Sequence, residues 1–185
     1  MYFTIYVLLV FLILYQSVKQ TGGGNKPLAF YIYPTEFKTE MLSIIAEGKV
    51  WPRVFAPVLR PEKADFTIEI VPRDKMQQML IRTDPVEYYP NTKKRIHFSY
   101  TLNGNRILLD EDNWRYGVDE SRLAIGVYRK YVLQHEIGHV LGYGHQKCLT
   151  RKCPVMYQMT RGPPKGYGQD GVDLTPVDIN TLPTL

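Results

Sequence analysis

The sequence predicts an α+β fold in one domain, preceded by a hydrophobic segment. Three observations predict it. Short runs that alternate apolar and polar residues, typical of half-buried strands, are interspersed with segments of helical periodicity. A long helical pattern in the C-terminal half carries histidines at fixed spacing. The apolar and charged fractions, 44% and 22%, are ordinary for a globular chain, and 185 residues are enough to bury a core.

The chain begins with a hydrophobic segment. Residues 2–15 carry no charge and are apolar apart from Thr4. With residues 16–18 the segment reaches the lower length limit of a membrane-spanning helix, and its length also suits the apolar core of a signal peptide. Because a basic start and an obvious cleavage site are lacking, an uncleaved anchor over residues 1–18 is the favoured interpretation.

Either interpretation directs the chain to a membrane, so we expect a membrane-anchored or secreted protein. Residues 19–27 include three consecutive glycines and predict a flexible linker, and residues 28–185 are expected to form the folded domain. Lys19 and Lys26 follow the hydrophobic segment, which by the positive-inside tendency favours a cytoplasmic domain. Two lysines leave the sidedness open.

The charge pattern argues against one class of partner. The net charge is +5, but the basic residues are scattered in short groups along the chain. A nucleic-acid groove needs a denser basic stripe with aromatic residues between the charges. We therefore expect a solvated surface and no nucleic-acid partner, and no pattern in the sequence indicates an oligomeric state.

The first half of the domain is expected to alternate strands and helices. Residues 28–33 predict a strand, and a helix follows from a cap at Thr35 to Glu47, where Gly48 ends it. Residues 51–61 are rich in proline and predict an irregular chain. The elements expected next are a strand over residues 65–71, a short helix over residues 73–81 and a loop over residues 84–91.

Two further strand-like runs predict a hairpin. Residues 95–101 and 105–110 favour strands, and the Asn-Gly dipeptide at positions 103 and 104 between them is a strong hairpin signal. This hairpin is expected to complete the sheet.

A long helix over residues 120–141, capped by Asp119, carries the most informative pattern of the chain. His135 and His139 are four residues apart, so both imidazoles project from one face of the helix. Glu136 is rotated away from that line but stays close enough to reach a water molecule on a metal ion held by the histidines. The helix therefore places two metal-ligating rings beside one carboxylate.

The pattern continues beyond the helix. Gly142 tolerates a positive φ, so the chain turns sharply there and brings His145 back as a third nitrogen ligand. Three protein nitrogens and an open fourth position are the composition of a catalytic zinc site, which predicts Zn²⁺ as the cofactor. Glu136 is the candidate catalytic residue, as a general base. Three of the four histidines of the chain fall within this pattern, and the packing of a buried helix does not require such spacing.

The extended pattern H-E-x-x-H-x-x-G-x-x-H resembles the signature of the metzincin clan of zinc metallopeptidases. Metzincins have a methionine in a tight turn under the metal, the Met-turn. Residues 153–157 follow the third histidine at a suitable distance, which makes Met156 the candidate and Met159 its competitor. The resemblance implies a zincin-type domain with a twisted mixed sheet, a long active-site helix and a C-terminal helix, here over residues 174–182.

The sequence more closely resembles a metzincin-like family of uncharacterised function, known mostly from actinobacterial secreted proteins. The likeness is carried by YRKYV at residues 128–132, the histidine pattern, Cys148, and PVMYQMT at residues 154–160. It covers residues 28–182 and is strongest over residues 121–160. In metzincins a peptide substrate typically pairs with an exposed edge strand above the zinc, so the resemblance implies one strand of the hairpin as the platform.

Cys148 and Cys153 are the only cysteines and lie between the third histidine and the Met-turn candidate. Three states are open to them: a disulfide, a second metal site, or free thiols. A second zinc would need more ligands, and His97 is the only histidine left. Because the N-terminal segment directs the chain to a membrane, a disulfide is favoured, whereas a cytosolic domain would favour free thiols.

The function expected from these features is that of a zinc-dependent endopeptidase acting on a peptide or protein substrate, with Glu136 as general base. Two alternatives stay open. One is a zinc-binding structural or assembly protein that keeps the fold without turnover. The other is a zinc hydrolase acting on a non-peptide amide. The presence of Glu136 together with all three histidines argues against the idle protein.

Overall fold

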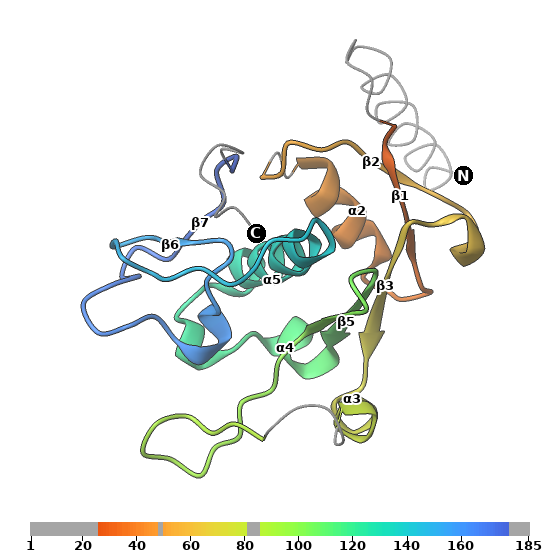
Figure 1. Ribbon diagram of the computed structural model, residues 1–185. Helices are drawn as coiled ribbons and strands as arrows, with labels where there is room; N and C mark the ends of the chain where they lie inside the picture. The colour runs from red at the N-terminus through yellow and green to blue at the C-terminus, as the bar shows by residue number, and fades with distance from the viewer. Residues whose placement is uncertain (1–25, 48–49, 81–85, 178–185) are drawn as a thin grey trace.

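The computed structural model describes residues 26–47, 50–80 and 86–177. The predicted anchor (residues 1–18) and all but the end of the linker lie outside the described residues. In these ranges, no helix has the length and apolar character needed to cross a bilayer. Figure 1 shows a mixed sheet with helices packed mainly on one side, which confirms the predicted α+β class.

Five strands form the main sheet, in the order β2-β1-β3-β5-β4. Neighbouring strands are parallel except for β4, which is antiparallel to β5 and lies at one edge of the sheet. The antiparallel pair is the hairpin that the Asn-Gly dipeptide predicts. The strands are β1 (Leu28–Ile32), β2 (Phe55–Pro57), β3 (Phe66–Val71), β4 (Tyr100–Leu102) and β5 (Arg106–Asp110).

The proline-rich stretch needs a correction. Residues 51–61 were expected to be irregular, but β2 lies within them and pairs with β1 through Leu28 and Phe55. A strand at the sheet edge needs hydrogen bonds on one side only, so it tolerates the ring of Pro57. The proline signal therefore indicated an edge strand and not the absence of a strand.

The first strand of the hairpin is also shorter than expected. A strand was predicted over residues 95–101, but the ladder with β5 holds only Tyr100–Leu102. Before it, Ser99 Oγ accepts a hydrogen bond from the main-chain N–H of Asp110, and Arg95 forms an isolated bridge with Tyr88. A side-chain oxygen thus takes the N–H that a longer ladder would have used.

The described residues include four α-helices. Helix α5 contacts α2, α4, β4 and β5, so it packs on one face of the sheet near the end formed by β5 and β4. Successive side chains of β5 belong to different apolar clusters. Ile107 and Leu109 belong to the main core on this face, and Leu108 packs with Met76 of α3 in a smaller cluster. The helices are α2 (Lys38–Glu47), α3 (Arg73–Leu80), α4 (Glu111–Tyr116) and α5 (Ile125–Val140).

The start of the long helix differs from the prediction. Asp119 was expected to cap a helix over residues 120–141, whereas a short 3-10 helix (Asp119–Ser121) ends at Arg122, whose φ of 58° is left-handed. Helix α5 begins only at Ile125, and Ala124 offers no side-chain cap. Helix α4 was not predicted; the Asp110 side chain caps it by accepting a hydrogen bond from the N–H of Asn113.

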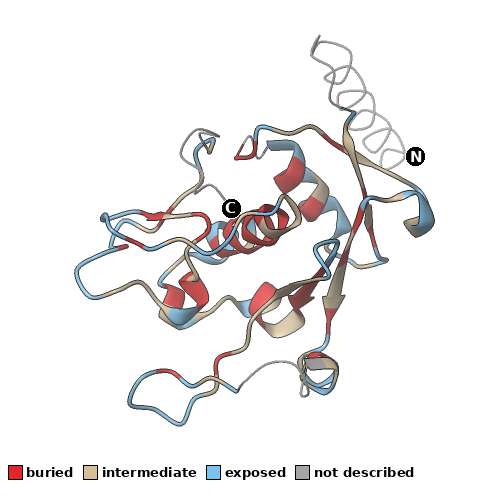
Figure 2. Ribbon diagram, viewed as in Figure 1, coloured by how far each residue is buried: buried red, intermediate tan, exposed pale blue. Residues whose placement is uncertain are grey.

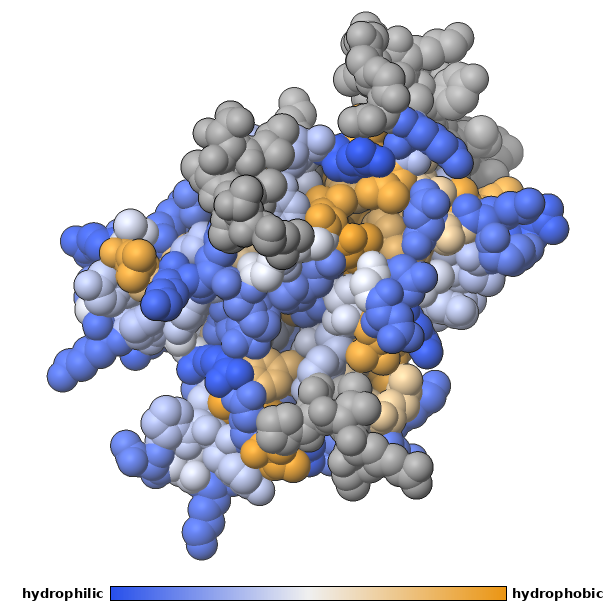
Figure 3. Space-filling view, in the orientation of Figure 1, coloured by the Kyte–Doolittle hydropathy of each residue, from blue (hydrophilic) through white to orange (hydrophobic). Residues whose placement is uncertain are grey.

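Helix α5 is exposed at its first turn and buried over most of its second half. Residues 131–138 are all buried, and Figure 2 shows the buried colour along most of the helix. The viewed surface of the molecule is mainly hydrophilic with separate hydrophobic areas (Figure 3). A helical segment that is buried on every side belongs to the interior of the protein. The first two residues of the histidine pattern, His135 and Glu136, therefore lie inside the protein and not on its surface.

The C-terminal helix implied by the resemblance falls largely beyond the described part. Residues 174–177 have no helix, and residues 178–182 lie outside the described residues. The described chain ends shortly after a small parallel sheet of β6 (Cys153–Pro154) and β7 (Val172–Asp173).

Candidate metal centre

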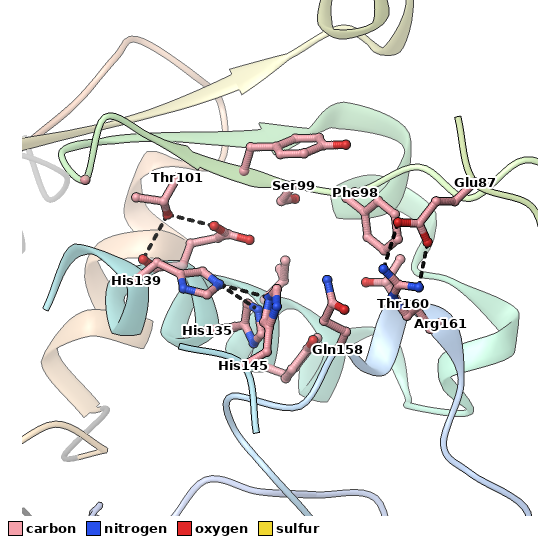
Figure 4. A pocket seen from close by; sticks show the side chains of 15 residues that line it. Glu87, Phe98, Ser99, Thr101, His135, His139, His145, Gln158, Thr160 and Arg161 are labelled. Carbon is pink, nitrogen blue, oxygen red and sulfur yellow. Dashed lines mark hydrogen bonds and ion pairs between the residues drawn. The ribbon is translucent and has the colours of Figure 1, made fainter. Parts of the chain in front are cut away.

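The structure brings the three motif histidines together at the C-terminal end of α5. His135 and His139 lie on the helix, Gly142 after it has a φ of 89°, and His145 returns on the turn. One ligand atom from each histidine lies within 4.8 Å of the other two. The sharp turn expected at the glycine is therefore present, and three rings converge as Figure 4 shows.

The distances between the ring nitrogens match a metal chelate. His139 Nε2 lies 3.2 Å from Nε2 of His135 and 3.2 Å from Nε2 of His145. Two nitrogens bound to one zinc at 2.0–2.1 Å in tetrahedral geometry are roughly 3.3 Å apart. The distances from His139 Nε2 to the other two Nε2 atoms thus match two edges of a coordination tetrahedron.

Main-chain carbonyl groups orient two of the rings. His135 Nδ1 is 2.8 Å from the carbonyl oxygen of Val155, and His139 Nδ1 is 2.8 Å from that of Tyr143. A carbonyl accepts from Nδ1–H, so the proton sits on Nδ1 and the Nε2 lone pair is left for a metal. Because Val155 precedes Met156, the segment of the predicted Met-turn fixes the tautomer of the first histidine.

Burial keeps the three rings neutral. It lowers the pKa of His135 to about 3, against a small opposing effect of the Val155 carbonyl, and lowers the pKa of His145 to about 4. The pKa of His139 is lowered by burial as well. Neutral imidazole is the form that ligates metal ions, so the site is ready to ligate at neutral pH.

Glu136 lies deep beside the histidines. Its side chain is 3% exposed, and burial raises the pKa of its carboxyl to about 7, while a hydrogen bond from Thr101 acts in the opposite direction. Thr101 Oγ1 lies 2.7 Å from Glu136 Oε2 and 3.0 Å from the main-chain oxygen of the same residue. A carboxyl group with a pKa near neutrality is suited to take up and release protons.

Met156, the Met-turn candidate, packs against helix α5 at Gly138. Met156 is 1% exposed, and its Sδ contacts the Cα of Gly138 so closely that a Cβ there would collide with it. Met159, the competitor, is also buried, but its main-chain N–H donates to the hydroxyl of Tyr131, one turn before His135. Met156 is therefore the methionine that packs between the two helical histidines.

The two cysteines form the favoured disulfide. Cys148 and Cys153 are bonded to each other, which confirms that prediction and leaves no thiol for a second metal. Within the described residues the three histidines are the only group of potential ligands of this kind, and His97 lies apart near Gln77. The disulfide closes the loop between His145 and the Met-turn.

A cavity of about 490 Å³ opens above the histidines. Its size falls in the range of ligand sites in proteins. Edge strand β4 supplies Tyr100 and Thr101 to one wall, and Tyr131 and Val132 of α5 supply another. In Figure 4 the histidines lie at one end, Gln158 lies between, and Arg161 with Glu87 lies at the other.

An ion pair stands at that far end of the cavity. Arg161 Nη1 lies 2.6 Å from Glu87 Oε2, and Arg161 Nη2 lies 2.8 Å from Glu87 Oε1. The guanidinium also lies over the ring of Phe98, 5.2 Å from its centre. The far end of the cavity is therefore polar, and its arginine packs on an aromatic ring.

A loop of residues 86–97, called here the covering loop, carries Glu87 and is fastened beside the cavity. The hydroxyl of Tyr89 donates to the main-chain oxygen of Thr160 at 2.7 Å, in a buried position. Lys94 pairs with Glu120 at 2.7 Å. The covering loop is thus tied to the segments on both sides of α5 in the sequence.

Several residues of the site were not predicted. Thr101, Trp51 and Arg161 lie far in sequence from one another or outside the motif, and no spacing rule marks them. Trp51, whose indole N–H donates to the main-chain oxygen of Gln134, sits in the stretch that was expected to be irregular. Only the hairpin expected as a platform gave an indication, because it contains Thr101.

One family model matches most of the chain, including the whole histidine pattern. The model of a family described as "Protein of unknown function (DUF3152)" matches residues 35–166. No curated protein matches the chain. The matched range contains the three histidines, Glu136, both cysteines and Met156, but the family description carries no activity.

Proposed function

The chain belongs to the DUF3152 family of proteins of unknown function, and we propose that it is a zinc-dependent endopeptidase. One observation carries the proposal: three neutral imidazoles converge beside a buried carboxyl group at the end of an open cavity. A site that only needed a structural metal would be expected to surround it with four protein ligands. Among the described residues the group of potential ligands stops at three, and these histidines line an open cavity.

The donor set fits zinc. Imidazole nitrogens suit zinc among the transition metals, and spacings of 3.2 Å between Nε2 atoms suit its tetrahedral geometry. When bound, zinc supplies a Lewis acid that polarises a carbonyl group and lowers the pKa of water toward about 7. The carbonyl oxygens of Val155 and Tyr143 would hold two of the rings in the ligating tautomer.

The residues of the chain divide the work of amide hydrolysis. Glu136 accepts a proton as water attacks the carbonyl carbon and passes that proton to the leaving amine. The outer edge of β4, the last strand of the sheet, would hold an extended peptide by main-chain hydrogen bonds, with its carbonyl group over the histidines. Side chains of the substrate would enter the cavity toward Arg161.

The cellular setting belongs to the same proposal. A hydrophobic segment at residues 1–18 would place the catalytic domain at a membrane or outside the cell, and the Cys148–Cys153 bond supports the non-cytosolic side. A peptide or protein would be the substrate there, and no nucleic acid is expected as a partner.

The test compares the purified full chain with its Glu136→Gln variant. We expect about one zinc per chain in both proteins by elemental analysis. The wild type is expected to cleave dye-labelled casein and Glu136→Gln to cleave it only slowly, because the amide cannot accept the proton. A loss of at least about 100-fold in kcat/KM is expected from removal of a general base.

Two outcomes contradict the proposal in different ways. Bound zinc with no cleavage by either protein favours the alternative of a zinc-binding structural protein with the same fold. Equal cleavage by both proteins means that Glu136 is not the base. A His139→Ala variant serves as a further control, since it removes the central ligand and should lose both zinc and cleavage.

A further inference from the structure

We propose that Thr101 is a positioning residue that holds the Glu136 carboxylate toward the histidines. This inference rests on the proposed function, and it adds a residue that lies 35 positions before Glu136 in the sequence. Thr101 comes from the edge strand β4, whereas Glu136 comes from the central helix α5. The hydrogen bond between them joins the two walls of the cavity.

The geometry of the contact favours a positioning role. Thr101 Oγ1 lies 2.7 Å from Glu136 Oε2, which is the short distance expected when a hydroxyl donates to a carboxylate. Thr101 is β-branched and sits in a strand, so its χ1 angle has few options. A glutamate side chain has three torsions between backbone and carboxylate, and the helix fixes only its origin. A stiff donor on a neighbouring strand therefore supplies the constraint that the helix cannot.

A second contact fixes the donor itself relative to the helix. The same hydroxyl lies 3.0 Å from the main-chain oxygen of Glu136. The hydroxyl hydrogen is shared between two acceptors on one residue. Thr101 therefore contacts both the side chain and the backbone of Glu136 and fixes the carboxylate relative to the helix. Because β4 is also the edge where a peptide would pair, the base and the substrate are positioned by the same strand.

The direct test is the position of Glu136 in crystal structures of the full chain. Thr101→Val keeps the shape and the strand propensity but removes the hydroxyl, and Thr101→Ser keeps the hydroxyl. We expect the Glu136 carboxylate to move by about 1 Å or more, or to spread over several rotamers, in Thr101→Val and to stay in place in Thr101→Ser. An unmoved carboxylate in Thr101→Val overturns the inference.

The kinetic test uses dye-labelled casein and the zinc content of each variant. Thr101→Val should retain zinc but lose about 10- to 100-fold in kcat/KM, as a misplaced catalytic group does, and Thr101→Ser should restore most of it. Thr150→Val is the matched control, because its hydroxyl donates to the main-chain oxygen of Lys152 in the exposed disulfide loop. That variant should cleave casein like the wild type.

Combining Thr101→Val with Glu136→Gln separates positioning from a general loss of structure. If Thr101 acts through Glu136, adding Thr101→Val to Glu136→Gln causes no further loss, whereas independent effects multiply. Multiplication therefore overturns the inference. If the wild type does not cleave casein at all, the proposed function fails, and the crystal structures still decide whether Thr101 holds Glu136.

Discussion

Gly138 shows at the scale of one residue how closely the site is packed. It lies in α5 between the two helical histidines, where a Cβ would collide with Met156 Sδ and approach Trp51 Cζ2 to 2.6 Å. The methionine end can shift, but the indole is held by its hydrogen bond to Gln134. We expect Gly138→Ala to lower the free energy of unfolding by about 1–3 kcal/mol, as overpacking of a core does, measured by urea denaturation.

Gly126 provides the matched control for this substitution. It lies in the same helix, and a Cβ there would meet nothing within 4 Å. Gly126→Ala should leave the free energy of unfolding unchanged or raise it by up to about 1 kcal/mol, because alanine costs less conformational entropy in a helix. Equal destabilisation by both variants would show that the collision at Gly138 is not the cause.

The residues of the site divide into those that the sequence could predict and those that it could not. His135, His139 and His145 lie within eleven consecutive residues, so helical geometry and one glycine turn suffice to bring them together. Thr101 reaches Glu136 only because β4 folds beside α5, and that pairing depends on the whole sheet. Local spacing therefore predicts the histidine cluster but not the side chain that contacts Glu136.

The covering loop illustrates the same dependence among larger elements. Its buried hydrogen bond from the hydroxyl of Tyr89 to the main-chain oxygen of Thr160 joins segments 71 residues apart. We expect Tyr89→Phe to lower the free energy of unfolding by about 1–3 kcal/mol, because a buried carbonyl loses its donor. Urea denaturation of the full chain provides the measurement.

The neighbouring tyrosine makes the comparison specific. Tyr88 is 56% exposed, so solvent water can replace the hydroxyl that is lost in Tyr88→Phe. That variant should unfold like the wild type within about 0.5 kcal/mol, which is usual for surface substitutions. If Tyr89→Phe behaves in the same way, the covering loop is not fastened through this hydrogen bond.

Among the elements, local signals predicted strands and helices better than their ends. The strand at residues 65–71 and the helix at residues 73–81 agree with β3 and α3 to within a residue, because alternation and helical periodicity are strong there. The predicted start of α5 was wrong, because Asp119 begins a short 3-10 helix instead of capping α5. Arg122 then adopts a left-handed conformation. Such a conformation has no sequence signal in arginine.

For the molecule as a whole, a metal that binds only the folded state must stabilise it. Zinc at 100 times its dissociation constant should raise the free energy of unfolding by about 2.7 kcal/mol, and removal of the metal by a chelator should reverse the gain. Thermal denaturation with and without zinc measures this. The His139→Ala variant should show no gain, and a gain as large as that of the wild type would place the zinc elsewhere.

The disulfide also has a consequence for the whole site. Cys148 and Cys153 are 5% and 0% exposed, so a reductant reaches their bond only when this side of the molecule opens locally. The bond lies in the segment between His145 and Met156. The rate at which a mild thiol reagent reduces the disulfide therefore measures how often this segment opens.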